Sequence, residues 1–280
     1  MKRKVNAVSK HVLLIVLVAI WLLPIVWLFA TSLSTYRGIN TMRFFPESVT
    51  FGNYVELFTK PDTVANFPAW FKNSMIIGVC SCVVSTCFVL MTAYAFSCMR
   101  FAGRKKLMSF SIILGMFPGV LSMIALYFVL KMLGLSNSIL GLIIVYSGAS
   151  GLGYLICKGF FDTIPVSLRE AAKLEGASQL TIFTRVVIPL SKPIIVYTVI
   201  NSFLNPWMDF VMAKLMIRSK NTADWTVAMG LFNMCQRTLV GDYFTLFCAG
   251  GVVVAIPISI LFVIMQKFYV EGITGGAVKG

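Results

Sequence analysis

Residues 75–99 read MIIGVCSCVVSTCFVLMTAYAFSCM, a stretch without Asp, Glu, Lys or Arg. A helix that crosses the hydrocarbon core of a bilayer needs about 20 mostly apolar residues. Inside lipid every backbone polar group must be paired within the protein, which only a helix or a closed barrel achieves. The stretch lacks the alternation of apolar and polar residues that marks a barrel strand. It therefore predicts a membrane-spanning helix.

Similar runs occur along the whole chain. Residues 12–36, 107–130, 132–157 and 243–266 are free of charge, and 193–213 carries one acid, Asp209. We expect an all-α polytopic membrane protein, with one transmembrane domain over 1–280. Its six predicted spans cover about 12–33, 75–98, 107–130, 138–157, 193–213 and 246–266. The fifth is interrupted by polar residues, and Asn205-Pro206 predicts a kink in it.

The composition of the 280 residues agrees with this class. Of these residues, 58% are hydrophobic and 12% are charged, against roughly 25% charged in a typical soluble domain. This excludes an ordinary cytosolic enzyme, a disordered chain and a secreted disulfide scaffold. The first run follows a basic stretch and could be a signal peptide. It is longer than the usual apolar core of about 7–15 residues and has no clean cleavage site, which favours an uncleaved span.

The net charge of +14 raises the alternative of nucleic-acid binding. If both termini are cytoplasmic, the inner segments are 1–11, 99–106, 158–192 and 267–280. They hold 15 of the 24 Lys and Arg residues. Such an excess on the inner side is the orientation signal of bacterial membrane insertion. We therefore interpret the charge as a topology signal, predict the cell membrane as the location, and expect no nucleic-acid partner.

Enzyme chemistry finds little support in the sequence. The chain has one histidine, His11, and seven cysteines that mostly lie in apolar runs, so we expect no metal site. It has no phosphate-binding Gly-x-x-x-x-Gly-Lys-Ser/Thr motif. Gly115-x-x-x-Gly119 is more typical of helix packing. We predict that the chain is not an enzyme and binds no cofactor itself.

The third inner segment, 162–190, is the most informative. Pro165 breaks the preceding helix, and Ser167 with Glu170 has the spacing of a capping box. Gly176 is suited to a left-handed helix end, and a second helix is expected over Gln179–Val187, stopped by Pro189. This predicts two short helices outside the membrane, with the small residues Ala171 and Ala172 offering an edge to another protein. A plain amphipathic loop on the membrane surface remains the alternative.

The same loop resembles the EAA signature of importer permeases of the ATP-binding cassette superfamily. Glu170-Ala171-Ala172 is followed by three residues and Gly176, and nine more residues lead to Val186-Val-Ile-Pro189. The resemblance implies a type I importer fold in which this loop couples to an ATPase subunit. Glu170 would meet a basic residue of the ATPase, and Gly176 would permit the turn. The coupling residues it implies are Glu170, Ala171, Ala172, Gly176 and Pro189.

Other stretches resemble carbohydrate importer permeases. They are Phe45-Pro46 with Thr50-Phe-Gly-Asn-Tyr54, and Phe71-Lys-Asn-Ser74. The tail 271–280 is similar to that of the smaller permease subunits of maltose/maltodextrin transporters. There it reaches between the ATPase subunits, which implies contacts by Gly275, Gly276, Lys279 and Gly280. Glycines suit a backbone that threads a narrow cleft, although a flexible end is the simpler interpretation.

The resemblance implies several partners. They are a second homologous permease subunit, two ATPase subunits that bind ATP and Mg, and an extracytoplasmic sugar-binding protein. The function it implies is uptake of oligosaccharides. In the outer segment 219–242, Trp225 and the polar stretch 233–237 are candidates for contact with the binding protein, although a solvated loop is an equal alternative.

Polar residues inside spans are costly and often functional. Sugars are held by aromatic faces and by amide or hydroxyl groups. The candidates for a substrate pathway are Asn201, Asn205, Trp207, Asp209, Tyr146 and Ser150, with Ser147 and Tyr154 nearby. Packing between helices with satisfied hydrogen bonds is the favoured alternative for all of them.

Three other functions remain open. A permease for another solute, such as glycerol phosphate or a polyamine, would share the loop signature. A stand-alone channel or carrier would need ionisable relays in the spans, where only Asp209 qualifies. A membrane enzyme would need clustered His, Asp or Glu, and none is seen. The sequence does not identify the sugar.

Overall fold

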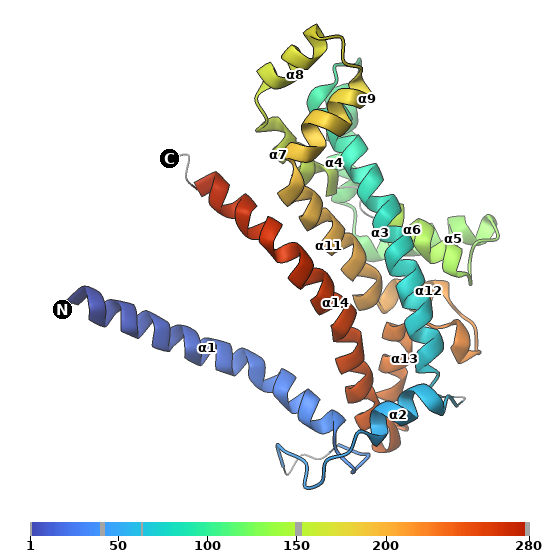
Figure 1. The fold of residues 1–280 in the computed structure, drawn as a ribbon. Coiled ribbons are helices and arrows are strands. Elements are labelled where there is room, and N and C mark those ends of the chain that lie inside the picture. Colours follow the sequence, from blue (N-terminus) through green and yellow to red (C-terminus); the bar gives the residue numbers. More distant parts are fainter. Residues whose placement is uncertain (1, 40–42, 63, 149–152, 278–280) are drawn as a thin grey trace.

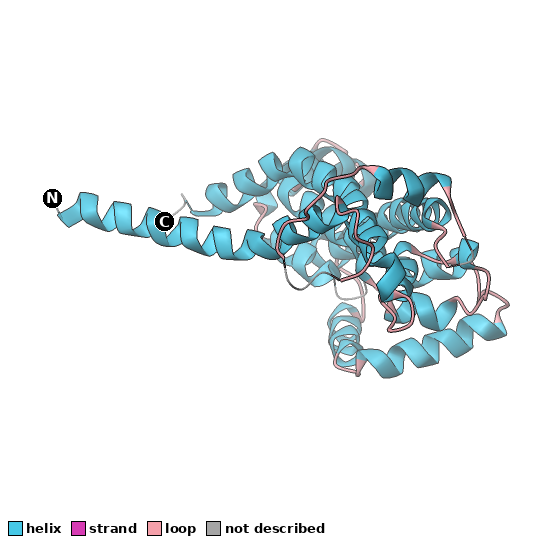
Figure 2. Ribbon diagram, turned by 90° about the horizontal axis from the view of Figure 1, so that it is seen from below, coloured by secondary structure: helices cyan, strands magenta, loops and turns pink. Residues whose placement is uncertain are grey.

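The computed structural model describes residues 2–39, 43–62, 64–148 and 153–277 (Figure 1). Over these ranges the chain is helical, and the extended pairing is limited to one antiparallel bridge between Ser34 and Val49. Helices and their connecting loops make up the view from below in Figure 2. The all-α class predicted from the apolar runs is therefore confirmed.

Fourteen α-helices are numbered along the described chain. They are α1 (Lys2–Ser32), α2 (Gly52–Thr59), α3 (Phe67–Cys98), α4 (Arg104–Gly115), α5 (Gly119–Met132), α6 (Ile139–Gly148), α7 (Gly153–Asp162), α8 (Val166–Leu174), α9 (Gln179–Ile182), α10 (Ile188–Leu190), α11 (Lys192–Met208), α12 (Val211–Met216), α13 (Val227–Met234) and α14 (Val240–Ala277). A π-helix, η1 (Phe183–Val187), joins α9 to α10, and a short 3₁₀ helix, η2 (Thr222–Asp224), precedes α13.

Four stretches of the described chain are long and apolar enough to cross a membrane as single units. They are Ser9–Ser32, Phe67–Cys98, Ile139–Asp162 and Val240–Lys267. Two further pairs qualify if each bent pair counts as one span. The first pair is α4 with α5, and the second joins Gln179–Leu190 to α11. The upper limit of six agrees with the number of predicted spans.

The predicted span 107–130 is not one continuous helix. The chain bends by 102° between helices α4 and α5. Gly115 ends the first helix, and Pro118 immediately precedes the second. A proline cannot donate a backbone hydrogen bond, and the residue before it avoids helical geometry. Gly115 and Gly119 therefore flank a break, so the two glycines do not lie on one continuous helix as the expected packing motif requires.

Other helix ends also differ from the predicted ranges. Helix α3 begins at Phe67, with Pro68 in its first turn, where a missing N–H costs nothing. Helix α11 ends at Met208, and Asp209 starts the next helix by accepting the Met212 N–H at 3.0 Å. The helix thus continues through Asn205-Pro206, where a kink was expected, and ends at Met208. The sharp bend of this segment, 87°, instead lies between Leu190 and Lys192.

Two hydrophobic clusters form the interior, and both involve α3 and α11. The first gathers Phe67, Trp70 and Ile77 of α3 with Phe203 and Trp207 of α11, and it adds side chains from α6, α12, α13 and α14. The second gathers the other half of α3 with α7, α9 and the start of α11. In Figure 1, α2 and α13 lie at the end of the first cluster, whereas α8 and α9 lie at the opposite end of the molecule.

Candidate functional site

The loop with the EAA-like residues forms a compact elbow of two short helices. Helix α8 ends in a Schellman turn, in which the Ala177 N–H bonds to Ala172 O at 3.0 Å and the Gly176 N–H to Lys173 O at 3.1 Å. Gly176 has φ +82°, the left-handed conformation that glycine adopts without steric cost. Ser178 then caps α9 by accepting the Thr181 N–H at 3.2 Å. The left-handed cap predicted at Gly176 is confirmed.

Two local predictions for the elbow are wrong. Ser167 does not cap α8, because the helix already begins at Val166 with Pro165 at the capping position and makes no side-chain cap bond. Pro189 does not stop the second helix, which continues to Leu190 through the π-helix η1. Proline disturbs the helical turn before it. The wide turn closed by the Ile188 N–H on Phe183 O accommodates that disturbance while the helix continues.

The elbow divides its predicted coupling residues between two faces. Glu170 and Ala171 are exposed, as are Gly176 and Pro189. Ala172 is half-buried and packs against the second hydrophobic cluster, so only one of the two alanines offers an edge to another protein. Leu174 at the end of α8 is 90% exposed and Leu180 of α9 is 70% exposed. The sequence interpretation missed this apolar tip, although leucines on the polar side of an amphipathic helix signal it.

The elbow is fastened to helix α3. The Tyr94 hydroxyl donates to the Gln179 side-chain oxygen at 2.8 Å, and its ring lies 4.9 Å from that of Phe183. A displacement of the elbow is therefore transmitted directly to α3. Tyr94 was not among the predicted site residues; a tyrosine near the end of an apolar run was its one sequence signal.

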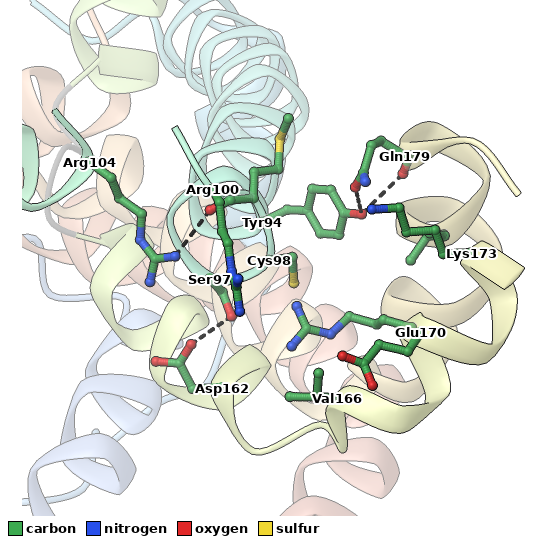
Figure 3. A pocket seen from close by; sticks show the side chains of 13 residues that line it. Tyr94, Ser97, Cys98, Arg100, Arg104, Asp162, Val166, Glu170, Lys173 and Gln179 are labelled. Carbon is green, nitrogen blue, oxygen red and sulfur yellow. Dashed lines mark hydrogen bonds between the residues drawn. The ribbon is translucent and has the colours of Figure 1, made fainter. Parts of the chain in front are cut away.

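A pocket of about 680 Å³ separates α8 from the junction of α3 and α4 (Figure 3). Basic side chains enter it from both sides: Arg100 and Arg104 from the junction, and Arg169 and Lys173 from α8. On the junction side Ser97 donates to the Asp162 carboxylate at 2.6 Å, and Lys158 pairs with the same carboxylate at 2.5 Å. Sequence analysis treated these basic residues as a topology signal and did not predict the pocket.

Three of the predicted pathway residues share a second pocket. Tyr146, Asn201 and Asn205 line a space of about 460 Å³, together with hydroxyl groups that include Ser85 and Ser202. The Tyr146 hydroxyl is buried, and the side chain interacts with Asp209. The Asn201 side chain donates to Tyr197 O at 2.8 Å. The volume falls in the range of about 300–1,000 Å³ that is usual for small-molecule sites.

Two other pathway candidates, Trp207 and Asp209, do not line this pocket. Trp207 packs in the first cluster, with its ring 5.4 Å from that of Phe71, and it closes over Gly78, where a Cβ atom would lie 2.8 Å from the indole nitrogen. Asp209 caps α12. Ser150 lies outside the described residues. The structure thus assigns packing and capping contacts to Trp207 and Asp209.

The two outer sequence patterns fasten elements together at the α2 end of the molecule. Asn53 is buried, and its side-chain amide donates to Ser32 O at 2.9 Å and to Ser34 O at 2.7 Å. Asn73 donates in the same way to Ala223 O at 2.8 Å and to Trp225 O at 2.9 Å. Both asparagines therefore hold a loop whose carbonyl groups would otherwise be unpaired.

Trp225 is not available to probe a partner as expected. It is buried, stacks on Trp70 with 6.4 Å between ring centroids, and donates its indole N–H to Ser219 O at 2.9 Å. The charged group of Lys214 covers the same ring at 4.9 Å. In the other candidate stretch, 233–237, Gln236 and Arg237 are exposed at the turn after α13.

The glycine-rich tail is more regular than expected. Helix α14 continues to Ala277, so Gly275 and Gly276 lie within a helix rather than in a freely threading segment. Lys279 and Gly280 lie outside the described residues. The described residues contain no group of three or more His, Cys, Asp or Glu side chains that could hold a metal ion.

Comparison with known proteins identifies this arrangement. Residues 90–274, which include the whole elbow, match the family described as binding-protein-dependent transport system inner membrane component. The chain belongs to this family. As an inner membrane component it is a membrane protein, in agreement with its apolar helices.

Curated relatives match this permease over its full length. The galactooligosaccharides transport system permease protein GanQ of Bacillus subtilis is 33% identical over 280 residues, covering 100% of this chain and 98% of the relative. The maltose/maltodextrin transport system permease protein MalG of Escherichia coli is 33% identical, covering 99% and 97%. The resemblance to importer permeases drawn from the elbow residues is therefore confirmed.

A solved structure shares the fold. The permease superposes with a TM-score of 0.78, at 22% identity, on a chain from a bacterial ABC transporter involved in the import of the acidic polysaccharide alginate. The alignment covers 96% of this chain and 98% of that chain. This likeness extends over the bent pairs as well as the single helices, and it confirms the importer permease fold predicted above.

Proposed function

We propose that this chain is one permease subunit of an ATP-driven importer that takes up neutral oligosaccharides of the maltodextrin or galactooligosaccharide type. The observation that carries the proposal is the elbow. Its helix α8 is exposed at one end of the molecule, with Glu170 on its open face and a rigid glycine turn behind it. Full-length relatives that transport such sugars support the substrate class.

In this proposal α8 receives the movement of an ATPase subunit. Glu170, Ala171 and the apolar tip at Leu174 form the docking face. Ala172 and Ala177 pack on the second cluster, and Tyr94 bonds to Gln179. A push on α8 therefore reaches α3 and α11, the two helices that extend into both clusters, without passing through a flexible loop.

The sugar would pass the pocket of about 460 Å³ between α3, α6 and α11. Its lining offers the hydrogen-bonding groups that sugar hydroxyls need, among them Tyr146, Asn201 and Asn205. The two asparagine amides can each donate and accept hydrogen bonds, which suits a path along which the sugar changes partners. This pathway role remains a proposal for these three residues.

The complete machine would contain partners that this chain lacks. We propose a second, homologous permease subunit, two ATPase subunits that hold ATP and Mg, and an extracytoplasmic binding protein that delivers the sugar. Both termini would be cytoplasmic, in line with the basic inner segments. The end of α14, with Gly275 and Gly276, would then reach the ATPase side, followed by Lys279 and Gly280.

The coupling role is tested with two single substitutions in the assembled transporter, reconstituted with its binding protein. We expect Glu170→Ala to reduce sugar uptake at least tenfold while ATP hydrolysis continues, because the docking contact no longer transmits movement. Glu175→Ala is the matched control, since this exposed glutamate stands at the C-terminal end of α8 and lies outside the proposed docking face. Normal uptake by Glu170→Ala, or equal loss in both variants, would refute the assignment of α8.

The substrate class is tested independently of coupling. We expect the binding protein encoded with this permease to bind malto- or galactooligosaccharides and to stimulate ATP hydrolysis by the complex only when loaded. If a charged solute such as glycerol phosphate or a polyamine gave that stimulation and oligosaccharides did not, the substrate proposal would fail while the coupling proposal stood.

A further inference from the structure

The pocket beneath α8 is built from two separate parts of the chain. The end of α3, the start of α4 and Asp162 form one wall, and α8 with Gln179 forms the other (Figure 3). The proposed transport path lies in another pocket, which shares no lining residue with this one. Glu170, Tyr94 and Gln179 of the proposed coupling belong to its lining, but that proposal gives no role to the basic side chains of the pocket.

Its charges do not balance. Four basic side chains line it, namely Arg100, Arg104, Arg169 and Lys173, against two carboxylates. Asp162 is already paired with Lys158 and Ser97. Asp162 also interacts with the charge of Arg104. Glu170 is left to face Arg100, Arg169 and Lys173, so the pocket carries a net positive charge.

One of these cations also lacks a hydrogen-bond acceptor. The Nε–H group of Arg169 is buried and has no partner among the described residues. Arg104 donates one N–H, to Met99 O at 3.1 Å. A polar donor that is buried without an acceptor is costly, and like charges that converge in a confined space repel one another. Both costs disappear when an anion occupies the space between the walls.

We propose that this pocket binds a phosphate group. Arginine presents a planar fork of donors that matches phosphate oxygens, and lysine adds a compact positive charge. Arg100 and Arg169 would hold the phosphate from opposite walls, and Lys173 would complete the charge. The volume of about 680 Å³ leaves space for an organic group attached to the phosphate, which could belong to a soluble phosphate ester or to a lipid headgroup.

An occupied site would have a mechanical effect. The phosphate would join the α3–α4 junction to α8, which otherwise meets it across an open space. It would therefore restrain α8, the element that we propose to move during transport. Binding itself requires neither sugar nor ATP, so it is tested separately from the proposed function.

The experiment uses the full chain in nanodiscs of phosphatidylcholine. Inorganic phosphate is titrated against chloride at equal ionic strength, and amide hydrogen exchange of residues 166–174 is followed. A second arm replaces part of the lipid by phosphatidylglycerol and omits phosphate. We expect at least fivefold slower exchange in one of the two arms, and the arm that responds identifies a soluble or a lipid source.

Three variants assign the effect to the pocket. Arg100→Gln and Arg169→Gln should weaken phosphate or lipid protection at least tenfold. Lys173→Gln, which alters an exposed side chain and so leaves the fold intact, should weaken it several-fold. Lys105→Gln is the control, because this exposed lysine of α4 lies outside the pocket lining, and its protection should equal that of the unmodified chain.

Three outcomes would overturn the proposal. One is equal protection by chloride and phosphate with no response to phosphatidylglycerol. Another is an equal loss of protection from amide exchange in Lys105→Gln and Arg169→Gln. The third is protection that appears only when an ATPase subunit is added, because the cations would then serve carboxylates of that partner instead of a phosphate.

Discussion

Gly176 shows how one residue sets the geometry of the elbow. Its positive φ lets the chain reverse after α8 while two backbone bonds close the turn. An L-residue with a Cβ atom pays about 1–2 kcal/mol in this conformation, whereas asparagine is tolerated better. No neighbouring atom lies within 4 Å of a Cβ built at this position, so the cost comes from the backbone alone.

We therefore predict a graded response at this position. Gly176→Ala should lower the stability of the α8 turn by about 1 kcal/mol and raise amide exchange in residues 166–174, and Gly176→Asn should have a smaller effect. Gly176→Pro should uncouple ATP hydrolysis from uptake without loss of membrane insertion. Equal exchange in all three variants would contradict a left-handed turn here.

Asn73 illustrates a residue that the sequence located by its motif but whose contacts it did not predict. Its pattern pointed to a family of sugar transporters, yet its contacts are structural, since one amide holds two carbonyl groups of the loop before α13. Because hydrogen bonds across more than a hundred residues leave no periodic trace, they could not be predicted from one sequence. The bond between Tyr94 and Gln179, which are 85 residues apart, leaves no periodic trace either.

Removing the Asn73 amide, which holds the loop before α13, should destabilise the first cluster. Asn73→Ala leaves two carbonyl groups unpaired, and we expect a loss of about 1–3 kcal/mol, seen as a lower thermal midpoint in tryptophan fluorescence. Lys72→Ala changes the neighbouring exposed side chain and should leave the midpoint unchanged. A shift in the lysine variant as large as in the asparagine variant would argue against this role of Asn73.

At the scale of elements, α13 packs unusually close to α3. Gly230 lies against the face of Trp70, and a Cβ atom there would approach the ring to 2.1 Å. The ring cannot retreat easily, because its indole N–H donates to Thr222 O at 2.7 Å and its other face stacks on Trp225. The contact thus joins α3, η2 and α13 into one unit.

Gly230→Ala is predicted to be destabilising for this reason. Overpacking of a filled core costs about 1–3 kcal/mol, to be measured as a fall in thermal midpoint of the purified chain. Gly241→Ala is the matched control, because a Cβ atom on this helical glycine of α14 would meet nothing within 4 Å. Alanine there should be neutral or slightly stabilising, since it is the better helix former.

Helix boundaries were harder to predict than helices. Apolar runs located the single spans, but the break between α4 and α5 leaves hydropathy unchanged, because Met116 and Phe117 are as apolar as their neighbours. The two prolines of the elbow behave differently: Pro165 lies between α7 and α8, as predicted, whereas Pro189 lies inside a continuing helix. Whether a proline ends a helix depends on whether the carbonyl group that it leaves without a donor can bond elsewhere.

At the scale of the whole molecule, the two ends have different characters. One end carries α2 and α13, and the other carries the elbow of α8 and α9 (Figure 1). Buried asparagines hold the loops at the first end, and the pocket arginines lie beside the elbow. Charge distribution predicted this polarity from the sequence, since basic residues accumulate in alternate segments. It could not predict the pocket, because Arg100 and Arg169 lie far apart along the chain and converge only through packing.

The orientation gives a direct prediction. Alkaline phosphatase, which is active only outside the cytoplasm, should be active when fused after Lys60 and inactive when fused after Lys106 or at the C-terminus. A fluorescent protein that folds in the cytoplasm should give the reverse pattern at these three positions. An active phosphatase at the C-terminus would reverse the proposed topology.

The exposed leucines at the tip of the elbow affect the life of the protein before it works. Leu174 and Leu180 are exposed at the elbow end of the molecule. If this end faces the cytosol, as the proposed topology has it, a newly inserted copy without its partner subunits would present both leucines there, the kind of surface that chaperones bind and proteases select. Surplus copies would then be degraded, and the amount of this chain would follow the supply of the subunit that covers the two leucines.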